Sequence, residues 1–313
     1  MRIAFAAAAL AVGIGLSGTR AEEAAFAVVS QAGAAVSFLS RSGLEGASVK
    51  LDDAPASIAA GPDGRTLYVT HPDRSRVTVL DAVTRTVTEK FNVAGSPFGA
   101  AATESELYVT DWANGSLVRI DALTGATTGT VSVGKSPAGL VLDVKRSRAY
   151  AADREGDAVG VIDLKTMRRV GQVKVGRAPF ALGLSPDGAR LFVANVQSGD
   201  LSVIDTFRLS EITRVPVGRM PYGVAVTSDG ERLAVTLQEE ATLLVIDAAK
   251  LTPLGRIKVG KYPEGVTISA DGRTAAVANW FDDSVTFVDL AGMTALSRIT
   301  TPAGPRYLAA LAQ

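Results

Sequence analysis

From about residue 26 onward, short apolar runs alternate with turn residues along the whole chain. One stretch contains four such runs, Tyr222–Thr227, Arg232–Thr236, Thr242–Asp247 and Gly255–Val259. Each run is rich in Val, Ile, Leu or Thr, and residues typical of turns bound it. This pattern predicts four short β-strands within about 40 residues.

The same four-strand unit recurs at a nearly constant spacing. Two independent markers share this spacing, a proline before the first strand and an aspartate at the end of the third. The prolines are Pro55, Pro97, Pro137, Pro179, Pro221, Pro263 and Pro305, and the aspartates are Asp81, Asp121, Asp163, Asp205, Asp247 and Asp289. Because each aspartate recurs unit after unit, we interpret the series as turn-capping residues rather than as one active site.

A period of about 42 residues with four strands per unit is typical of a β-propeller blade. Asp-Gly turns join the first two strands in four units, at residues 62–64, 186–188, 228–230 and 270–272. Glycine tolerates the positive φ that such tight hairpins need. The second and third units lack Asp-Gly and must turn at residues 103–105 and 145–147 by other means.

The two ends of the chain predict how the ring closes. Three strands are expected near the start, at Phe26–Ser30, Ala35–Leu39 and Ala47–Leu51, and a single one at the end, over residues 305–311. One C-terminal strand plus three N-terminal strands completes a seventh blade. We therefore predict an all-β, seven-bladed β-propeller whose closure leaves no open edge between the first and last blades.

Several motifs resemble a known repeat. Tyr68-Val69-Thr70-His71, Tyr108-Val109-Thr110-Asp111 and Phe192-Val193-Ala194-Asn195 are similar to the Tyr-Val-Thr-Asn signature, and Val161-Ile162-Asp163 and Val203-Ile204-Asp205 match its later Val-Ile-Asp element. The chain thus resembles the YVTN-repeat, YncE-like propellers, which are related in fold to the heavy chain of quinoprotein amine dehydrogenases. The resemblance implies a propeller that supports or docks a partner, in some relatives within quinone- or cytochrome-linked oxidation systems.

The first residues predict export. A basic residue, Arg2, precedes an apolar stretch from Ile3 to Leu16, and small residues around Ala21 offer a cleavage site. This is typical of a secretory signal peptide. We expect residues 1–21 to be removed and residues 22–313 to form a single propeller domain in the periplasm, with no transmembrane segment remaining.

Composition narrows the possible chemistry. The chain has no cysteine, which excludes disulfides, thiolate metal sites and covalent c-type haem attachment. Without Arg2 and Arg20, 30 basic residues face 32 acidic ones, a net charge of −2 that gives no overall attraction to nucleic acid. No serine-nucleophile elbow or phosphate-binding loop is present. We expect no cofactor and a monomer.

Candidate binding residues gather in the loops of one face, here called the top face: the loops before the repeat prolines and those after the second strand of each blade. Basic residues precede the prolines of four successive blades, and aromatic residues follow the prolines or occupy the second-strand loops. They are Lys135, Arg177, Arg219 and Lys261, together with Phe98, Phe180, Tyr222, Trp112 and Trp280. Loops on a rigid scaffold commonly carry binding residues, and aromatic and arginine side chains are enriched at binding hot spots.

We expect a non-catalytic propeller whose top face binds a partner protein or a small anionic ligand. One alternative is a metal-dependent, lactonase-type hydrolase at the channel mouth, with His71, Asp111, Asp153 and Asn195 as candidate ligands and Glu264 nearby. Another is nucleic-acid binding through the basic residues and tryptophans. The acidic loop residues Glu155, Asp157, Glu239, Glu240, Asp282 and Asp283 disfavour this second alternative.

Overall fold

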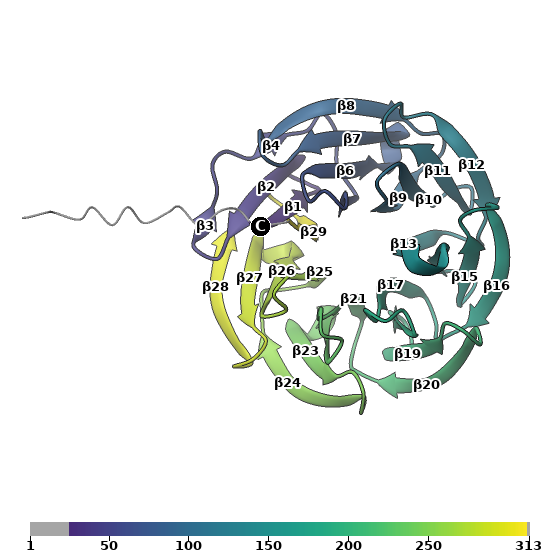
Figure 1. Ribbon diagram of the computed structural model, residues 1–313. Helices are drawn as coiled ribbons and strands as arrows, with labels where there is room; N and C mark the ends of the chain where they lie inside the picture. Colours follow the sequence, from purple (N-terminus) through teal and green to yellow (C-terminus); the bar gives the residue numbers. More distant parts are fainter. Residues whose placement is uncertain (1–24, 312–313) are drawn as a thin grey trace, which may run out of the picture.

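The computed structural model describes residues 25–311, and these form a ring of seven blades around a central axis (Figure 1). Each blade is an antiparallel sheet, and in the first six blades the strands run outward from the axis in chain order. The predicted fold class is confirmed. The predicted signal peptide, residues 1–21, lies outside the described residues. Within residues 25–311, no helix has the length and apolar character needed to span a membrane.

The inner half of each blade consists of two strands. The innermost strands start at or just after the repeat prolines: β5 (Ser57–Ala60), β9 (Pro97–Ala102), β13 (Pro137–Asp143), β17 (Pro179–Leu184), β21 (Pro221–Val226), β25 (Pro263–Ile268) and β29 (Pro305–Ala310). The second strands are β6 (Thr66–His71), β10 (Glu106–Asp111), β14 (Arg148–Asp153), β18 (Arg190–Asn195), β22 (Arg232–Leu237), β26 (Thr274–Asn279) and β1 (Phe26–Ser30).

The outer half contains two further strands. The third strands are β7 (Arg76–Asp81), β11 (Ser116–Asp121), β15 (Ala158–Asp163), β19 (Asp200–Asp205), β23 (Thr242–Asp247), β27 (Ser284–Asp289) and β2 (Ala35–Ser40). The outermost strands of the first six blades are β8 (Thr86–Asn92), β12 (Thr127–Ser132), β16 (Arg168–Lys174), β20 (Ser210–Pro216), β24 (Thr252–Lys258) and β28 (Thr294–Thr300).

The seventh blade joins the two ends of the chain, as predicted. Strand β29 pairs antiparallel with β1, so that Phe26 lies opposite Ala310 and Val28 opposite Leu308. The outermost strand of this blade differs from the prediction of one continuous run over Ala47–Leu51. It consists of two short pieces, β3 (Gly43–Leu44) and β4 (Val49–Lys50), which pair with different ends of β2.

The hydrophobic core lies between neighbouring blades. The second and third strands are buried along almost their full length, whereas the outermost strands are mostly exposed. One cluster joins Leu201 and Val203 of β19 to Leu233 and Val235 of β22 in the next blade. Each sheet therefore buries both faces against its neighbours, which explains why its central strands have apolar residues on both sides.

The aspartate series caps turns on the bottom face, the face opposite the top face, as predicted. Asp81 Oδ1 accepts hydrogen bonds from the backbone N–H groups of Val83 (2.8 Å) and Thr84 (2.9 Å), and the other five aspartates make equivalent bonds. In the third blade, a short 3₁₀ helix, η2 (Val144–Arg146), replaces the Asp-Gly turn. Ser147 then takes a left-handed conformation with φ of 52°.

Threonines of the second strands connect neighbouring blades near the axis. Thr110 Oγ1 accepts a hydrogen bond from Gly99 N of its own blade (2.8 Å) and donates one to the Ala138 carbonyl of the next blade (2.9 Å). Thr70 and Thr236 make the same pair of bonds. The approach is so close that a Cβ on Gly99 would lie 2.4 Å from the Ala138 carbonyl oxygen, so this position requires glycine.

Removing residues 305–313 tests the closure. The deletion exposes the edge of β1 and removes the buried Leu308, Ala309 and Leu311. We expect a loss of at least 10 °C in melting temperature, since each kcal/mol corresponds to roughly 2–4 °C in a chain of this size. Calorimetry measures the loss, and deletion of residues 312–313 alone is the control. A deletion variant that melts like the wild type would contradict the observed closure.

Thr110→Val tests the connection between blades. Valine keeps the shape of threonine but leaves the Gly99 N–H and the Ala138 carbonyl without this partner. We expect a loss of about 2 kcal/mol of unfolding free energy, because unsatisfied buried polar groups cost about 1–3 kcal/mol each. Urea denaturation measures it. Thr127→Val, on the exposed face of β12, is the control and should change stability by less than about 0.5 kcal/mol.

Candidate functional site

Seven equivalent positions surround the axis at the top of the channel. Each is the residue that directly follows a repeat proline, and each comes from a different blade. They are Ala56, Phe98, Ala138, Phe180, Tyr222, Glu264 and Arg306, here called the mouth ring. Six of the seven are less than 10% exposed, so the mouth ring closes the top of the channel.

Aromatic side chains fill most of the mouth ring. The rings of Phe180 and Tyr222 lie 4.1 Å apart between centroids, and Phe98 and Phe180 meet edge to face at 5.8 Å. Phe98 also contacts Trp112 at 5.0 Å and Tyr307 at 6.5 Å. Phe98 thus meets both Phe180 and Tyr307 edge to face, which is a favourable arrangement for aromatic pairs. The predicted binding residues Phe98, Phe180 and Tyr222 therefore contact one another at the axis rather than lying along an exposed rim.

Arg306 connects the polar side of the mouth ring. Its Nε donates to Glu264 Oε2 (2.9 Å), Nη2 donates to the Tyr222 hydroxyl (3.0 Å) and Nη1 donates to Gln31 Oε1 (3.3 Å). The guanidinium also lies over the rings of Phe98 (5.4 Å) and Trp280 (5.8 Å). Arginine suits this position because its planar group combines several directed donors with stacking on aromatic faces.

Burial changes the protonation of Glu264. Removal from water raises the pKa of this carboxyl group to about 7, and the adjacent Arg306 limits the rise. Gln238 Nε2 is a further donor to Glu264, at 3.4 Å, whereas Gln238 Oε1 is buried without a hydrogen-bond partner among the described residues. Burial and the charge of Glu264 also raise the pKa of Tyr222, so that this phenol stays neutral.

The predicted basic residues point outward around the mouth ring. Lys135, Arg177, Arg219 and Lys261 are all exposed and lie on four successive blades; they are here called the basic arc. Within residues 25–311, only Arg219 of the four has an ion-pair partner, Glu239 at 3.4 Å. The Arg219 side chain is 71% exposed, so this contact contributes little.

Several acidic residues of the top face are occupied by local contacts. Glu240 accepts a hydrogen bond from the Arg219 backbone N–H (2.8 Å) and pairs with Arg256 (2.8 Å). Asp282 accepts a hydrogen bond from the Lys261 backbone N–H (2.8 Å) and lies 3.5 Å from Arg298. These carboxylates hold the loops of the basic arc through the backbone and leave its cationic side chains in solvent.

The two tryptophans occupy equivalent top-face positions, as their repeat spacing predicts. Trp112 follows β10, and Trp280 begins the short 3₁₀ helix η4 (Trp280–Asp282). Both are half-buried, and an arginine guanidinium lies over each ring, that of Arg154 over Trp112 and that of Arg306 over Trp280. Both contact the mouth ring, Trp112 through Phe98 and Trp280 through Arg306.

The candidate metal ligands do not converge. His71 Nε2 is hydrogen-bonded to Thr78 (2.9 Å), and burial lowers the pKa of this imidazole. Asp111 accepts hydrogen bonds from Ser96 N (2.9 Å) and from the Asn114 side chain (2.6 Å). Each of these side chains is thus bonded within its own blade, His71 to strand β7 and Asp111 to loop residues.

The other two candidates behave in the same way. Asp153 accepts hydrogen bonds from Lys135 N (2.6 Å) and Gly156 N (3.0 Å), and the Asn195 amide donates to Asp200 (2.7 Å). In the described part of the chain, no three His, Cys, Asp or Glu side chains form a group that could hold a metal ion. Nor does the structure join Glu264 to Asp111, Asp153 and Asn195, as the hydrolase alternative requires.

The polar network around Arg306 is the part of the mouth that the sequence pattern did not assign. Gln31 and Gln238 come from different blades; Gln31 contacts Arg306 through closure of the chain, and Gln238 contacts Glu264 of the next blade. The sequence does single out Tyr307, because it is a large residue at a repeat position where the other six blades have a small one. Those small residues are Ser57, Gly99, Gly139, Ala181, Gly223 and Gly265.

These features define a seven-bladed β-propeller with a closed top mouth and an exposed basic arc. No protein-family model matches the sequence, and no curated protein matches it either. Among solved structures, a protein of unknown function from Desulfotomaculum acetoxidans DSM 771 is similar, with a TM-score of 0.82, 13% identity and coverage of 92% of this chain and 99% of that one. Hydrazine synthase from Kuenenia stuttgartiensis is also similar, with a TM-score of 0.56, 20% identity and coverage of 76% and 96%. At these identities the similarity shows the fold alone.

Glu264→Gln tests the buried carboxyl group. Since folding raises its pKa from 4.5 to about 7, protonated Glu264 stabilises the folded state. The contribution is fully present below about pH 4.5 and is lost as the pH rises through 7. The loss is on the order of 3 kcal/mol, at 1.36 kcal/mol per pKa unit.

We therefore expect the wild type to lose stability relative to Glu264→Gln between pH 5 and pH 8. Urea denaturation at several pH values measures the difference in unfolding free energy between the two proteins. His71 is present in both, so its effect cancels in this difference; its lowered pKa makes stability rise with pH, opposite to the effect of Glu264. The control is Glu104→Gln on an exposed turn. Parallel pH profiles for wild type and Glu264→Gln would show that the carboxyl group titrates normally.

Proposed function

We propose that this protein is an exported, non-catalytic binding propeller whose top face binds a partner protein or a small anionic ligand. The observation that supports this most directly is the basic arc. Four exposed cations lie on successive blades, three of them without an ion-pair partner within residues 25–311. A one-sided group of unpaired charges attracts an oppositely charged partner and orients it during encounter.

The surroundings of the basic arc support binding rather than catalysis. Local hydrogen bonds occupy Asp111, Asp153 and Asn195, and Glu264 is paired with Arg306. Half-buried Trp112 and Trp280 add aromatic surface next to the arc, the residue type that most often dominates binding energy.

The finer assignment rests on the repeat motifs. The Tyr-Val-Thr and Val-Ile-Asp elements support membership of the YVTN-repeat, YncE-like propellers, and the basic, apolar start of the chain supports export to the periplasm. We propose on this basis that the propeller is a docking module, which accompanies a quinone- or cytochrome-linked oxidation system.

Cross-linking and kinetics together test the top face. A photo-reactive residue in place of Arg177 should cross-link the partner in the exported fraction of the source cells.

The double variant Arg177→Glu, Arg219→Glu should then slow association of that partner at least tenfold at low salt, where screening is weak, and by less at high salt. Trp112→Ala should mainly speed dissociation, because it removes contact area. Surface plasmon resonance measures both rates.

The opposite face provides matched controls. Arg65 and Arg273 lie beside the Asp-Gly turns of the bottom face, and both are exposed. A photo-reactive residue at position 65 should not cross-link the same partner, and Arg65→Glu with Arg273→Glu should leave association unchanged. The top-face proposal is wrong if these bottom-face changes impair binding and those in the basic arc do not.

A further inference from the structure

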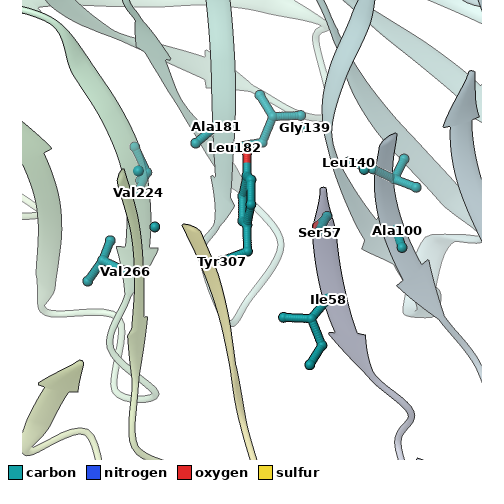
Figure 2. A pocket seen from close by; sticks show the side chains of 13 residues that line it. Ser57, Ile58, Ala100, Gly139, Leu140, Ala181, Leu182, Val224, Val266 and Tyr307 are labelled. Atoms are coloured by element: carbon teal, nitrogen blue, oxygen red, sulfur yellow. The ribbon is translucent and has the colours of Figure 1, made fainter. Parts of the chain in front are cut away.

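A cavity of about 180 Å³ lies on the axis below the mouth ring (Figure 2). Every blade contributes to it through its innermost strand. The lining residues are Ser57, Ile58, Gly99, Ala100, Gly139, Leu140, Ala181, Leu182, Gly223, Val224, Gly265, Val266 and Tyr307. The lining side chains other than those of Ser57 and Tyr307 are aliphatic, and glycine backbone forms the rest of the surface, so the cavity suits an uncharged occupant with a largely apolar body.

One blade breaks the symmetry of the cavity. At the second position after the repeat proline, six blades have glycine, alanine or serine, and the closing blade has Tyr307. Glycine is required in two of these blades, since a Cβ on Gly139 or Gly265 would lie 2.3 or 2.5 Å from a carbonyl oxygen of the next blade. Figure 2 shows the Tyr307 phenol standing in the middle of the cavity, with its oxygen toward Leu182 and Gly139.

The polar side-chain groups of the cavity are two hydroxyls. They belong to Tyr307 and Ser57, which both line the cavity. Burial raises the pKa of Tyr307 well above its ordinary value, so that its phenol remains a neutral donor. No Lys, Arg, His, Asp or Glu side chain lines the cavity, so nothing there would compensate an ionic group.

The cavity is closed at the top and continues toward the bottom face. Phe98, Phe180 and Tyr222 cover it above, each at most 9% exposed. Below, Ile58 and Ala100 also belong to a second hollow, of about 350 Å³, at the bottom mouth of the channel. All its lining side chains are apolar, and they belong to Ile58, Ala59, Ala60, Ala100, Ala101, Ala102, Leu142, Val144, Leu308, Ala309 and Ala310.

We propose that the axial cavity is a binding site for a small uncharged ring compound that has one oxygen, such as a cyclic ketone or alcohol. The ring contacts the aliphatic lining, and its oxygen pairs with the Tyr307 and Ser57 hydroxyls. The ligand reaches the site from the bottom face. This site is independent of the basic arc, and its test does not depend on the top-face partner.

The size of the cavity sets the size of the ligand. An apolar cavity of about 150 Å³ accepts benzene, which has six heavy atoms. The axial cavity is slightly larger, at about 180 Å³, and adds hydrogen-bonding groups that benzene does not use. Cyclohexanone, with about seven heavy atoms by the same comparison, is therefore a suitable probe.

Titration of cyclohexanone into the full protein, followed by NMR shifts of the protein, tests the proposal. We expect saturable binding at one site, and binding of cyclohexanecarboxylate at least tenfold weaker. Tyr307→Phe removes only the hydroxyl and should weaken cyclohexanone binding about fivefold, the usual net effect of one hydrogen bond. Ala181→Leu fills the cavity and should abolish binding.

Ala113→Leu, on an exposed top-face loop, is the matched control and should bind like the wild type. Thermal melting establishes whether each variant is folded. Tyr307→Phe is the mildest change, so it still tests the site if Ala181→Leu does not fold. The proposal is overturned by any of three results: no saturable binding to the wild type, equal binding of the carboxylate, or unchanged binding by folded Ala181→Leu and Tyr307→Phe.

Discussion

The close approach of seven innermost strands around one axis is the constraint on which this structure depends. At Gly99, Gly139, Gly223 and Gly265 the next blade's backbone leaves no room for a side chain. The same proximity lets Thr70, Thr110 and Thr236 bond to carbonyl groups of the following blade. Such an array is stable only as a closed ring, because an open one would leave a blade interface uncovered. Pairing of β29 with β1 supplies that closure.

The same crowding determines what the mouth can contain. Each blade contributes one residue of the mouth ring, and Phe98, Phe180 and Tyr222 are its large aromatic members, all buried. Glu264 and Arg306 are then forced together away from water, at 2.9 Å. A buried ion pair recovers its desolvation cost only when further hydrogen bonds satisfy its remaining donors and acceptors. Gln31, Tyr222 and Gln238 provide them here, which explains why residues from distant parts of the chain meet at this point.

The fold could be predicted from the sequence because its signals are local and repeated. The prolines, the Asp caps and the apolar runs each recur in one register, and the missing strands at the two ends identify the closing blade. The division of the last outer strand into β3 and β4 could not be predicted, since it depends on which parts of β2 the returning chain meets. The mouth was predictable only in part. The position directly after the repeat proline identified Phe98 and Tyr222 as candidates. Whether these side chains face solvent or the axis depends on residues of other blades, and a local sequence pattern does not show which residues meet there.

The two arginine environments of the top face have different consequences for binding. Arg306 has its charge matched by Glu264 and its guanidinium covered by Phe98 and Trp280, so it contributes little to the field outside the molecule. Arg177 and its neighbours in the basic arc remain in solvent while carboxylates such as Asp153 and Glu240 bind the backbone beneath them. A chain with a net charge near zero can therefore present a locally positive surface, because geometry separates its cations from its anions. Net charge alone does not identify the partners of this protein, and the side on which its unpaired charges lie is more informative.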